Sequence, residues 1–479
     1  MGPQKVDVAI IGAGISGLCV GYWLTQKGFS VIVLEKDLEV GGTMKTRIEE
    51  GFLVETGPNS ALETTPLFGE LFSELNLQNE LVYAHPVGRN RFILRDAQLH
   101  PLPLNPFSFL ASKLFSTGAK LRLLREPWVG RANHEETVAE FVARRLGQEF
   151  LDYAIDPFVA GVYAADPASL SVRAAFPKLY RLEELYGSLI LGAIKGRKER
   201  KERTEKAKDH AASFSFQHGM QVLPSAIASR LGKRVLLEAR VTRIHDLRLL
   251  DEEPTDEPDA RTFKLEFLHQ GASREIECDA VVLSCPAFAA APLVQPLSPQ
   301  HAHTLEAIPY APVVSLFLGF RQKDIRHPLN GFGFLVPQKE ERKILGCLWS
   351  SSLFPNRAPD GMVGLTVFVG GSRQPELTSL SDEETQILVL EELKSIMQIQ
   401  GKPVYWKASR WERAIPQYRR GHVQAIEALE EFEDKTKGIF FCANYRGGIA
   451  VGDCVMNAHT TAERVARLLT AQNTLSPIF

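Results

Sequence analysis

The chain alternates between short apolar runs and amphipathic stretches in which apolar residues recur every three to four positions. Val6–Ile11, Ser30–Glu35 and Ala280–Ser284 are largely apolar, which is typical of strands buried on both faces of a parallel sheet. A glycine-rich turn and the helical stretch Ser16–Lys27 connect the first two. This order predicts a strand–helix–strand unit of about 30 residues.

The pattern changes after residue 90. Apolar residues at helical spacing dominate Phe107–Leu124, Thr137–Leu151 and Leu182–Ile194, and the charged segment Lys195–Asp209 follows. We interpret this stretch as a helical insertion. The charged segment favours a solvated helix or loop, and a basic contact to anionic lipid is the alternative.

Strand patterns then return. Ser213–Phe216 reads as a strand, and strands alternate with turns from Val313 to Gly370. Asp382–Ile399 predicts an amphipathic helix. The chain closes with the strand Gly438–Cys442, a glycine-rich turn and the helix Met456–Leu469. We therefore expect an α/β protein with more than one sheet.

Composition narrows the function classes. The 479 residues are 44% hydrophobic and 23% charged, which is ordinary for a globular chain of about two to three domains. The net charge of −2 lacks the basic excess of a nucleic-acid-binding protein. Six cysteines without C-x-x-C spacing or a histidine cluster favour free thiols and no metal site. We expect no signal peptide, and no transmembrane helix because no run of about 18 apolar residues occurs.

The turn after the first strand carries a phosphate-binding motif. Gly12-Ala13-Gly14-Ile15-Ser16-Gly17 fits G-x-G-x-x-G, in which the glycines permit a tight turn, close approach to a pyrophosphate and close helix–strand packing. The helix N-terminus adds unpaired N–H groups. Glu35 ends the next strand, where a carboxylate accepts hydrogen bonds from ribose hydroxyls. These residues predict a bound dinucleotide.

The pair Gly41-Gly42 and the absence of a second G-x-G-x-x-G motif indicate a single dinucleotide, FAD. A glycine pair at this position gives an extended flavin a second close backbone approach. Without a nicotinamide unit, oxygen is the simplest electron acceptor. The return segment Gly438–Met456 can direct a helix dipole at the flavin ring.

With Glu55–Ser60 (ETGPNS), these motifs resemble the amine-oxidase superfamily of FAD proteins. Further blocks resemble the oxygen-dependent, plant-type protoporphyrinogen oxidases and follow that family's order along nearly the whole chain. They are Phe158–Pro167, Leu170-Ser171, Phe214–Phe216, Gly219–Pro224, Gly331–Pro337, Ser350–Pro359, Ala414–Tyr418 and Gly421-His422. Thr43 stands where the superfamily often has arginine, but plant-type members also lack that arginine.

The resemblance implies an α/β fold with three parts. A discontinuous Rossmann-like FAD domain of para-hydroxybenzoate-hydroxylase type takes residues 1–90 (with the start of the substrate domain), 211–290 and 426–479. A mixed-sheet substrate domain takes residues 291–425, and an α-helical membrane-binding insertion takes residues 91–210.

The resemblance also implies an activity. This is the FAD-dependent six-electron oxidation of protoporphyrinogen IX to protoporphyrin IX in porphyrin, haem or chlorophyll biosynthesis, with oxygen as acceptor and hydrogen peroxide as by-product. Coproporphyrinogen III oxidation, an amine oxidase or carotenoid desaturase, and a non-enzymatic flavoprotein stay open as alternatives.

The resemblance further implies the substrate site. Arg91 corresponds to the propionate-binding arginine, with Arg89 and Arg95 as rivals. A catalytic role falls to Gly161, whose backbone carbonyl faces the reacting methylene carbon; a left-handed, helix-ending glycine is the alternative. The macrocycle is expected to lie between Leu335, Leu348 and Phe368. The alternative is that these three are core residues without a substrate contact.

No general base emerges, because His134, His218 and His422 show no paired partner and the cofactor carries the chemistry. One noncovalent FAD per chain is expected, since no cysteine occupies the position of covalent attachment. Its expected contacts are Gly12, Gly14, Ile15, Ser16, Gly17, Glu35, Lys36, Gly41, Gly42, Thr43, Gly57, Pro58, Asn59, Ser60, Val241, Trp411, Ile449, Ala450 and Val451.

The stretch Phe107–Leu124 interleaves apolar residues with lysine and arginine, which favours a helix pair lying in a membrane interface. In that interpretation Phe109, Leu114 and Phe115 face lipid; packing within the insertion's own core is the alternative. The expected location is peripheral, on the cytoplasmic side of a membrane. Expected partners are the porphyrinogen, molecular oxygen and a membrane surface, with a homodimer and product hand-over to ferrochelatase as further options and no nucleic acid.

Overall fold

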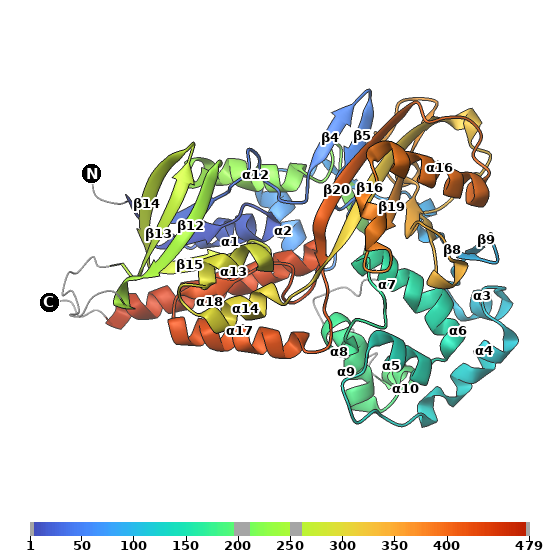
Figure 1. Ribbon diagram of the computed structural model, residues 1–479, viewed down its shortest axis with the longest axis horizontal. Helices are drawn as coiled ribbons and strands as arrows, with labels where there is room; N and C mark the ends of the chain where they lie inside the picture. Colours follow the sequence, from blue (N-terminus) through green and yellow to red (C-terminus); the bar gives the residue numbers. More distant parts are fainter. Residues whose placement is uncertain (1–3, 196–210, 250–260, 476–479) are drawn as a thin grey trace.

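The computed structural model describes residues 4–195, 211–249 and 261–475 (Figure 1). The charged segment Lys195–Asp209 lies outside these ranges apart from its first residue.

A parallel five-stranded sheet is assembled from distant parts of the chain. Its order is β11 (Val235–Leu236), β3 (Val31–Leu34), β2 (Val8–Ile11), β15 (Ala280–Leu283) and β21 (Ile439–Phe441). Strands β2, β3, β15 and β21 are wholly buried, as the apolar runs predicted. The expected α/β class with a discontinuous Rossmann-like sheet is confirmed.

Alternate residues of these strands enter two separate cores. One core lies between the sheet and the helices α1 (Ile15–Gln26), α12 (Val222–Leu231) and α18 (Val451–Leu475). The other lies under the strands β12 (Ala239–Asp246), β13 (Phe263–His269) and β14 (Ala272–Cys278) and the helices α13 (Ala287–Val294), α14 (Pro299–Glu306) and α17 (His422–Thr436). The sheet is therefore the middle of three layers.

A second, mixed sheet has seven strands. Its order is β20 (Tyr405–Pro416), β16 (Tyr310–Arg321), β19 (Met362–Gly370), β18 (Gly346–Leu348), β17 (Gly333–Leu335), β8 (Arg91–Arg95) and β9 (Gln98–Pro101). Only the β17–β8 pair is parallel. One face packs on α16 (Asp382–Met397) through a core that includes Val314, Leu365 and Val367. The opposite face packs partly on β5 (Phe52–Glu55), through Phe317 and Tyr405, and partly on residues 160–164.

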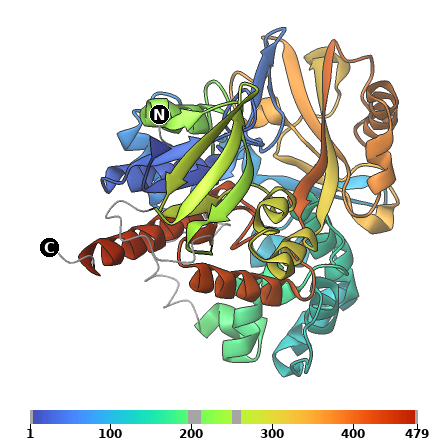
Figure 2. The same cartoon turned by 60° about the vertical axis from the view of Figure 1, so that its left-hand side comes forward.

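The insertion forms a separate lobe beneath this sheet, drawn in teal and green in Figures 1 and 2. Its elements are α3 (Pro106–Ala111), α4 (Thr117–Arg122), the 3-10 helix η2 (Leu123–Trp128), α5 (Val138–Arg145), α6 (Gln148–Phe150), the π-helix η3 (Leu151–Ile155), α7 (Asp156–Tyr163), α8 (Val172–Ala175), α9 (Pro177–Tyr186) and α10 (Leu189–Lys195).

The helices are shorter than the sequence pattern predicted. Phe107–Leu124 holds two six-residue helices, and Leu182–Ile194 is broken at Gly187, whose φ of 69° is left-handed. Thr137–Leu151 is interrupted after Arg145 by Gly147 at φ 101°. Apolar spacing continues across each break because the residues on both sides of it face the same core.

The prediction that Phe109, Leu114 and Phe115 face outward is wrong. Leu114 and Phe115 are 0% and 4% exposed, and Phe115 stacks on Phe150 with ring centroids 4.4 Å apart. Phe109 is partly buried against the same two rings. The exposed apolar side chains of this region are Leu104, Phe107, Leu110, Leu121, Leu124 and Trp128. Within the described ranges, no helix has the length and apolarity to cross a bilayer.

Candidate cofactor and substrate site

The G-x-G-x-x-G turn leaves open space at the start of α1. A Cβ added to Gly17 would lie 2.1 Å from the backbone oxygen of Gly12 and 2.2 Å from Oγ of Ser284, so this glycine is required for packing. A Cβ added to Gly14, the N-cap of α1, would meet no protein atom within 4 Å. The space beside Gly14 therefore lies at a helix N-terminus, where a phosphate is stabilised.

Two further glycine-rich segments border this space. Gly41 forms a β-bridge with Gly14 and donates its N–H to the oxygen of Ala13 at 2.8 Å. A Cβ on Gly57 would lie 2.0 Å from the backbone oxygen of Thr43. The predicted segments 12–17, 41–43 and 57–60 thus form one continuous cradle.

Glu35 is held at the rim of the cradle. Its carboxylate is 7% exposed and accepts the N–H of Ala13 at 2.7 Å and that of Asp37 at 3.0 Å. Each oxygen keeps a free lone pair, so the carboxylate can also accept ribose hydroxyls. The cradle and this carboxylate fit the adenosine and pyrophosphate of a dinucleotide.

Lys36 and Val241 flank Glu35 differently. The Lys36 ammonium is exposed and lies 2.9 Å from a carboxylate oxygen of Asp37, so it is directed along the surface. Val241 is half-buried on β12, whose first residue, Ala239, donates its N–H to the backbone oxygen of Glu35 at 2.7 Å. The structure therefore brings Val241, but not the head of Lys36, to the rim.

The C-terminal segment lies beside the residues that follow Ser60, since a Cβ added to Gly452 would lie 2.6 Å from Oγ1 of Thr64. Ile449 and Ala450 precede α18, and Val451 is its first residue. The hydroxyl of Tyr418 donates to the backbone oxygen of Asn444 at 2.6 Å and accepts the N–H of Gly448 at 3.1 Å. Tyr418 was not singled out from the sequence beyond its place in the Ala414–Tyr418 block, because its hydrogen bonds are made to residues distant in the chain.

The expectation that His218 and His422 lack partners is wrong. His218 lies 2.8 Å from a carboxylate oxygen of Glu80 at the surface. His422 stacks on Tyr418, with centroids 4.1 Å apart, and its Nε2 hydrogen-bonds the backbone oxygen of Tyr445 at 2.9 Å. Burial lowers the pKa of His422 to about 4, so the ring is neutral and structural.

Four predicted substrate residues share one face of the seven-stranded sheet. Gly333 pairs with Arg91 on one side and with Leu348 on the other. Gly346 pairs with both Leu335 and Phe368. Directly paired residues point to the same face, as do residues two apart on one strand. Arg91, Leu335, Leu348 and Phe368 are therefore neighbours on the face opposite the α16 core.

This face meets the cradle. Trp411, on the same face of β20, donates its Nε1–H to the backbone oxygen of Thr56 at 2.7 Å. Thr366, paired with Leu348, donates its hydroxyl to Oδ1 of Asn59 at 3.4 Å. Sequence reasoning missed Thr366, although it lies two residues before Phe368 on the same strand. The sheet face and segment 56–60 are therefore in contact.

The three candidate arginines are in different environments. The Arg91 guanidinium lies 5.1 Å from the centroid of Phe332, and among the described residues it has no ion-pair partner. Partial desolvation lowers its pKa although the side chain is exposed. The Arg95 guanidinium donates hydrogen bonds to the carboxylate of Glu149 and to the backbone oxygen of Leu114. Arg89 is exposed on the preceding 3-10 helix η1 (Pro86–Arg89).

Gly161 lies inside α7 and packs on the sheet face. A Cβ at Gly161 would approach Cδ2 of Leu335 to 2.5 Å. The alternative of a left-handed, helix-ending glycine is wrong, because the left-handed residue that ends α7 is Ala164, with φ 48°. Phe158 and Val162 on the same helix are 40% and 39% exposed, so α7 offers an apolar surface beside the site.

A buried carboxyl adjoins the cradle. Glu55 is 4% exposed, accepts the Thr46 hydroxyl at 2.7 Å and the Met220 N–H at 2.8 Å, and lies 4.0 Å from Nη2 of Arg357. Burial raises its pKa to about 7.

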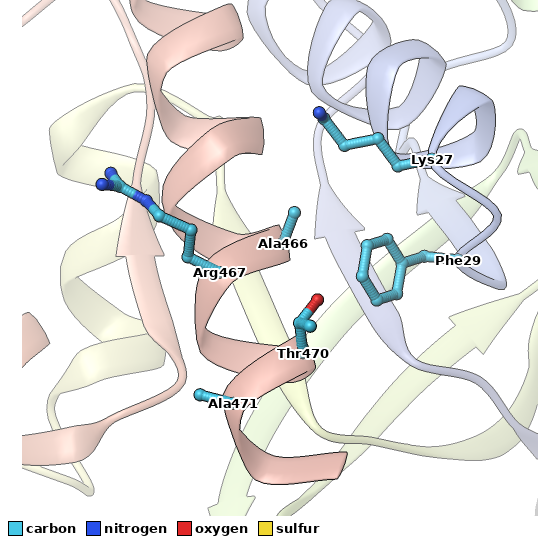
Figure 3. A pocket seen from close by; sticks show the side chains of 6 residues that line it. All are labelled: Lys27, Phe29, Ala466, Arg467, Thr470 and Ala471. Atoms are coloured by element: carbon cyan, nitrogen blue, oxygen red, sulfur yellow. The ribbon is translucent and has the colours of Figure 1, made fainter. Parts of the chain in front are cut away.

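A separate depression of about 520 Å³ lies between the end of α1 and α18 (Figure 3). Lys27, one of its lining residues, is held by Glu463 at 2.7 Å. It contains no predicted site residue, and it lies at the C-terminal end of α1 whereas the cradle lies at the N-terminus.

Comparisons with known proteins agree with this geometry. The model of the family of flavin-containing amine oxidoreductases matches residues 15–466. The chain is 33% identical over 485 residues to protoporphyrinogen oxidase 2, chloroplastic/mitochondrial, of Arabidopsis thaliana, covering 96% of this chain and 94% of that one. It is 28% identical over 473 residues to coproporphyrinogen III oxidase of Bacillus subtilis, covering 95% and 97%. A crystal structure of an Exiguobacterium protein shares the fold, with a TM-score of 0.77 at 24% identity, covering 97% and 99%.

Proposed function

The chain belongs to the family of flavin-containing amine oxidoreductases, and from that premise we propose that it oxidises protoporphyrinogen IX to protoporphyrin IX. The observation that carries the proposal is the sheet face bearing Arg91, Leu335, Leu348 and Phe368, which lies against the cradle segment 56–60. This face combines apolar surface with the unpaired cation Arg91, which suits a porphyrinogen with carboxylate arms.

One noncovalent FAD is proposed for the cradle. Its pyrophosphate would lie beside Gly14 and Gly41-Gly42, its ribose at Glu35, and its ring near Gly57–Ser60, Trp411 and Ile449–Val451. When bound, FAD supplies the acceptor for a hydride from the macrocycle, and oxygen then takes the electrons as hydrogen peroxide. Six electrons leave the substrate in three such oxidations, each consuming one oxygen molecule.

The protein's own residues bind and orient the macrocycle. Leu335, Leu348 and Phe368 pack against its faces, and Arg91 binds a propionate at the edge. Gly161, on the α7 wall, allows the macrocycle to approach the helix backbone and is proposed to present its carbonyl to the reacting methylene carbon. Apolar packing on both sides excludes water from the reacting carbon.

We propose that the part of this face around Arg91 binds propionates on one edge of the macrocycle. Lys407 lies in the same row of the sheet as Phe317 and Thr366, and it forms an ion pair with Glu49. Arg95 forms an ion pair with Glu149. Arg91 has no ion-pair partner among the described residues, and it lies beside Leu348 through their common pairing with Gly333. Protoporphyrinogen IX carries two propionates on one edge, whereas coproporphyrinogen III carries four around the ring, and the coproporphyrinogen reaction is the second candidate because of the Bacillus relative.

A parallel assay tests the proposal. Purified yellow protein is mixed with each porphyrinogen under air, and porphyrin fluorescence and peroxide are followed together. We expect protoporphyrin and peroxide at one to three, with faster turnover than for coproporphyrinogen. Faster coproporphyrin formation would select the second candidate, and no porphyrin from either would reject both.

We also propose that the insertion rests on a membrane surface. Its exposed apolar side chains Phe107, Leu110, Leu121, Leu124 and Trp128 project from α3, α4 and η2, and the exposed cations Lys113 and Arg125 lie among them. Apolar side chains flanked by cations suit the boundary between headgroups and acyl chains. Such a surface would give an apolar porphyrinogen a route from lipid.

A further inference from the structure

Both ends of helix α7 are tied to the strands that carry the proposed substrate contacts. α7 itself contributes Gly161, which packs on Leu335. Its position relative to the seven-stranded sheet therefore determines the width of the substrate slot, the space proposed between α7 and the face that bears Leu335, Leu348 and Phe368.

The N-terminal tie is a buried ion pair. Asp156, the first residue of α7, accepts the N–H of Gln338 at 2.8 Å and pairs with Arg373. Arg373 also donates to the backbone oxygen of Asp156 at 3.0 Å. Both side chains are 7% exposed. Gln338 follows β17 and Arg373 follows β19, so one carboxylate joins α7 to the two strands bearing Leu335 and Phe368.

The C-terminal tie uses the backbone oxygens at the end of α7 as acceptors. The oxygen of Ala164 accepts the N–H of Ser372 at 2.7 Å, next to Arg373. The side-chain amide of Gln417 donates to the oxygen of Tyr163 at 2.8 Å. Segment 371–373 therefore holds both ends of α7.

The preceding turn is irregular. Leu151–Ile155 forms a π-helix that runs directly into α7, and Pro157 follows at the second position of the helix. Turns of this kind are uncommon and often adjoin functional sites, because they shift the register of the following helix. The buried pair of Asp156 and Arg373 lies directly after this turn.

We propose that Asp156 and Arg373 are positioning residues that set the width of the substrate slot and thereby determine which porphyrinogen fits. The inference rests on the proposed function for its substrate. The clamp, meaning the Asp156–Arg373 pair together with the hydrogen bond from Gln338, is a property of the protein alone, so its effect on α7 can be measured without turnover.

Asp156→Asn tests the clamp. It keeps an oxygen for the N–H of Gln338 but leaves the buried guanidinium without its counter-charge. We expect faster amide hydrogen exchange across residues 156–166 and weaker binding of protoporphyrin IX, measured by quenching of protein fluorescence. We expect kcat/KM for protoporphyrinogen to fall by roughly ten- to a hundredfold, mainly through KM, and the preference over coproporphyrinogen to shrink.

Lys339→Met is the matched control. Lys339, the residue after Gln338, pairs at 3.1 Å with Asp152 of η3, the turn before α7, but it is 61% exposed. We expect exchange, binding and selectivity like those of the wild type. Gly161→Ala narrows the slot with the clamp intact, and it should weaken porphyrin binding without changing exchange.

The outcomes separate the two ideas. If the wild type binds protoporphyrin IX but oxidises neither porphyrinogen, the proposed function is wrong. Comparing amide hydrogen exchange in the wild type and in Asp156→Asn would still test the clamp. Unchanged exchange, binding and selectivity in Asp156→Asn would overturn the inference. If that variant does not fold, Arg373→Lys, which keeps the charge but loses the second hydrogen bond, must show the same changes in weaker form or the inference is wrong.

Discussion

Gly14→Val is expected to abolish flavin binding without harming the fold. Gly14 has φ −70° and ψ 174°, a backbone conformation open to any residue, and its added Cβ meets no protein atom within 4 Å. The valine side chain would instead occupy the space proposed for the pyrophosphate. The perturbation therefore acts on the cofactor alone.

The size of the effect follows from the hydrogen bonds displaced. A phosphate at this helix N-terminus would accept charge-assisted hydrogen bonds from backbone N–H groups, each contributing about 1.5–3 kcal/mol. Displacing the phosphate from two of them costs about 3–6 kcal/mol, which corresponds to a rise in Kd of roughly a hundred- to ten-thousandfold. Gly14→Ala, with only a methyl group, should have a smaller effect of the same sign.

The assay compares flavin content and stability of the apoprotein. Absorbance near the flavin band gives the FAD per chain after purification, and urea unfolding of flavin-stripped protein gives the free energy of unfolding. Gly69→Ala is the control, because an added Cβ there also meets nothing within 4 Å and lies on the exposed side of α2 (Leu67–Glu74). Gly17→Ala should fail differently, by destabilising the apoprotein, since its Cβ would overlap Gly12.

Normal flavin content in Gly14→Val would refute the cradle assignment. Loss of flavin together with a destabilised apoprotein would refute the argument that the space beside Gly14 is reserved for the cofactor.

Three other predictions follow from the same structure. Arg91→Ala should raise KM for protoporphyrinogen by roughly five- to thirtyfold, since the guanidinium is unpaired but exposed, and it should keep FAD bound. The control Arg95→Ala should lower stability instead. An unchanged KM in Arg91→Ala would indicate that another cation binds the propionate. Glu55→Gln should change how the free energy of unfolding depends on pH. Burial raises the pKa of Glu55 in the folded protein to about 7, above the ordinary 4.5, so the wild type loses about 3 kcal/mol of stability as pH rises between these values. Urea titrations of the variant should lack that loss. Replacing Phe107 and Trp128 by Ser should weaken sedimentation with anionic liposomes while preserving FAD and folding; wild type that never sediments would reject the membrane proposal.

Much of the cofactor cradle could be predicted from local sequence. A G-x-G-x-x-G motif after an apolar strand predicts a strand–turn–helix unit, because its glycines are required by steric contacts within one turn. Gly17, for example, must lack a side chain in order to pack on Gly12. Apolar runs such as Val8–Ile11 likewise predict buried parallel strands. These features depend on neighbours within a few tens of residues, which the sequence displays directly.

The substrate face was reachable only through resemblance to a family. Arg91, Leu335 and Phe368 are far apart in the chain and become neighbours through strand pairing, which no local pattern encodes. Hydrophobicity alone could not separate Leu114, which is wholly buried, from Leu110, which is 67% exposed. The direction of each side chain is set by where the short helices break.

The clamp on α7 depends wholly on the tertiary structure. Asp156 and Arg373 are 217 residues apart, and nothing near either residue indicates the other. Short-range sterics and recurring motifs were enough to predict the cradle, the parallel strands and the family, because these features depend on residues close together in the chain. Which charges are paired, which apolar residues are covered and where Gly161 lies were decided by long-range packing, because burial and pairing are properties of the assembled chain.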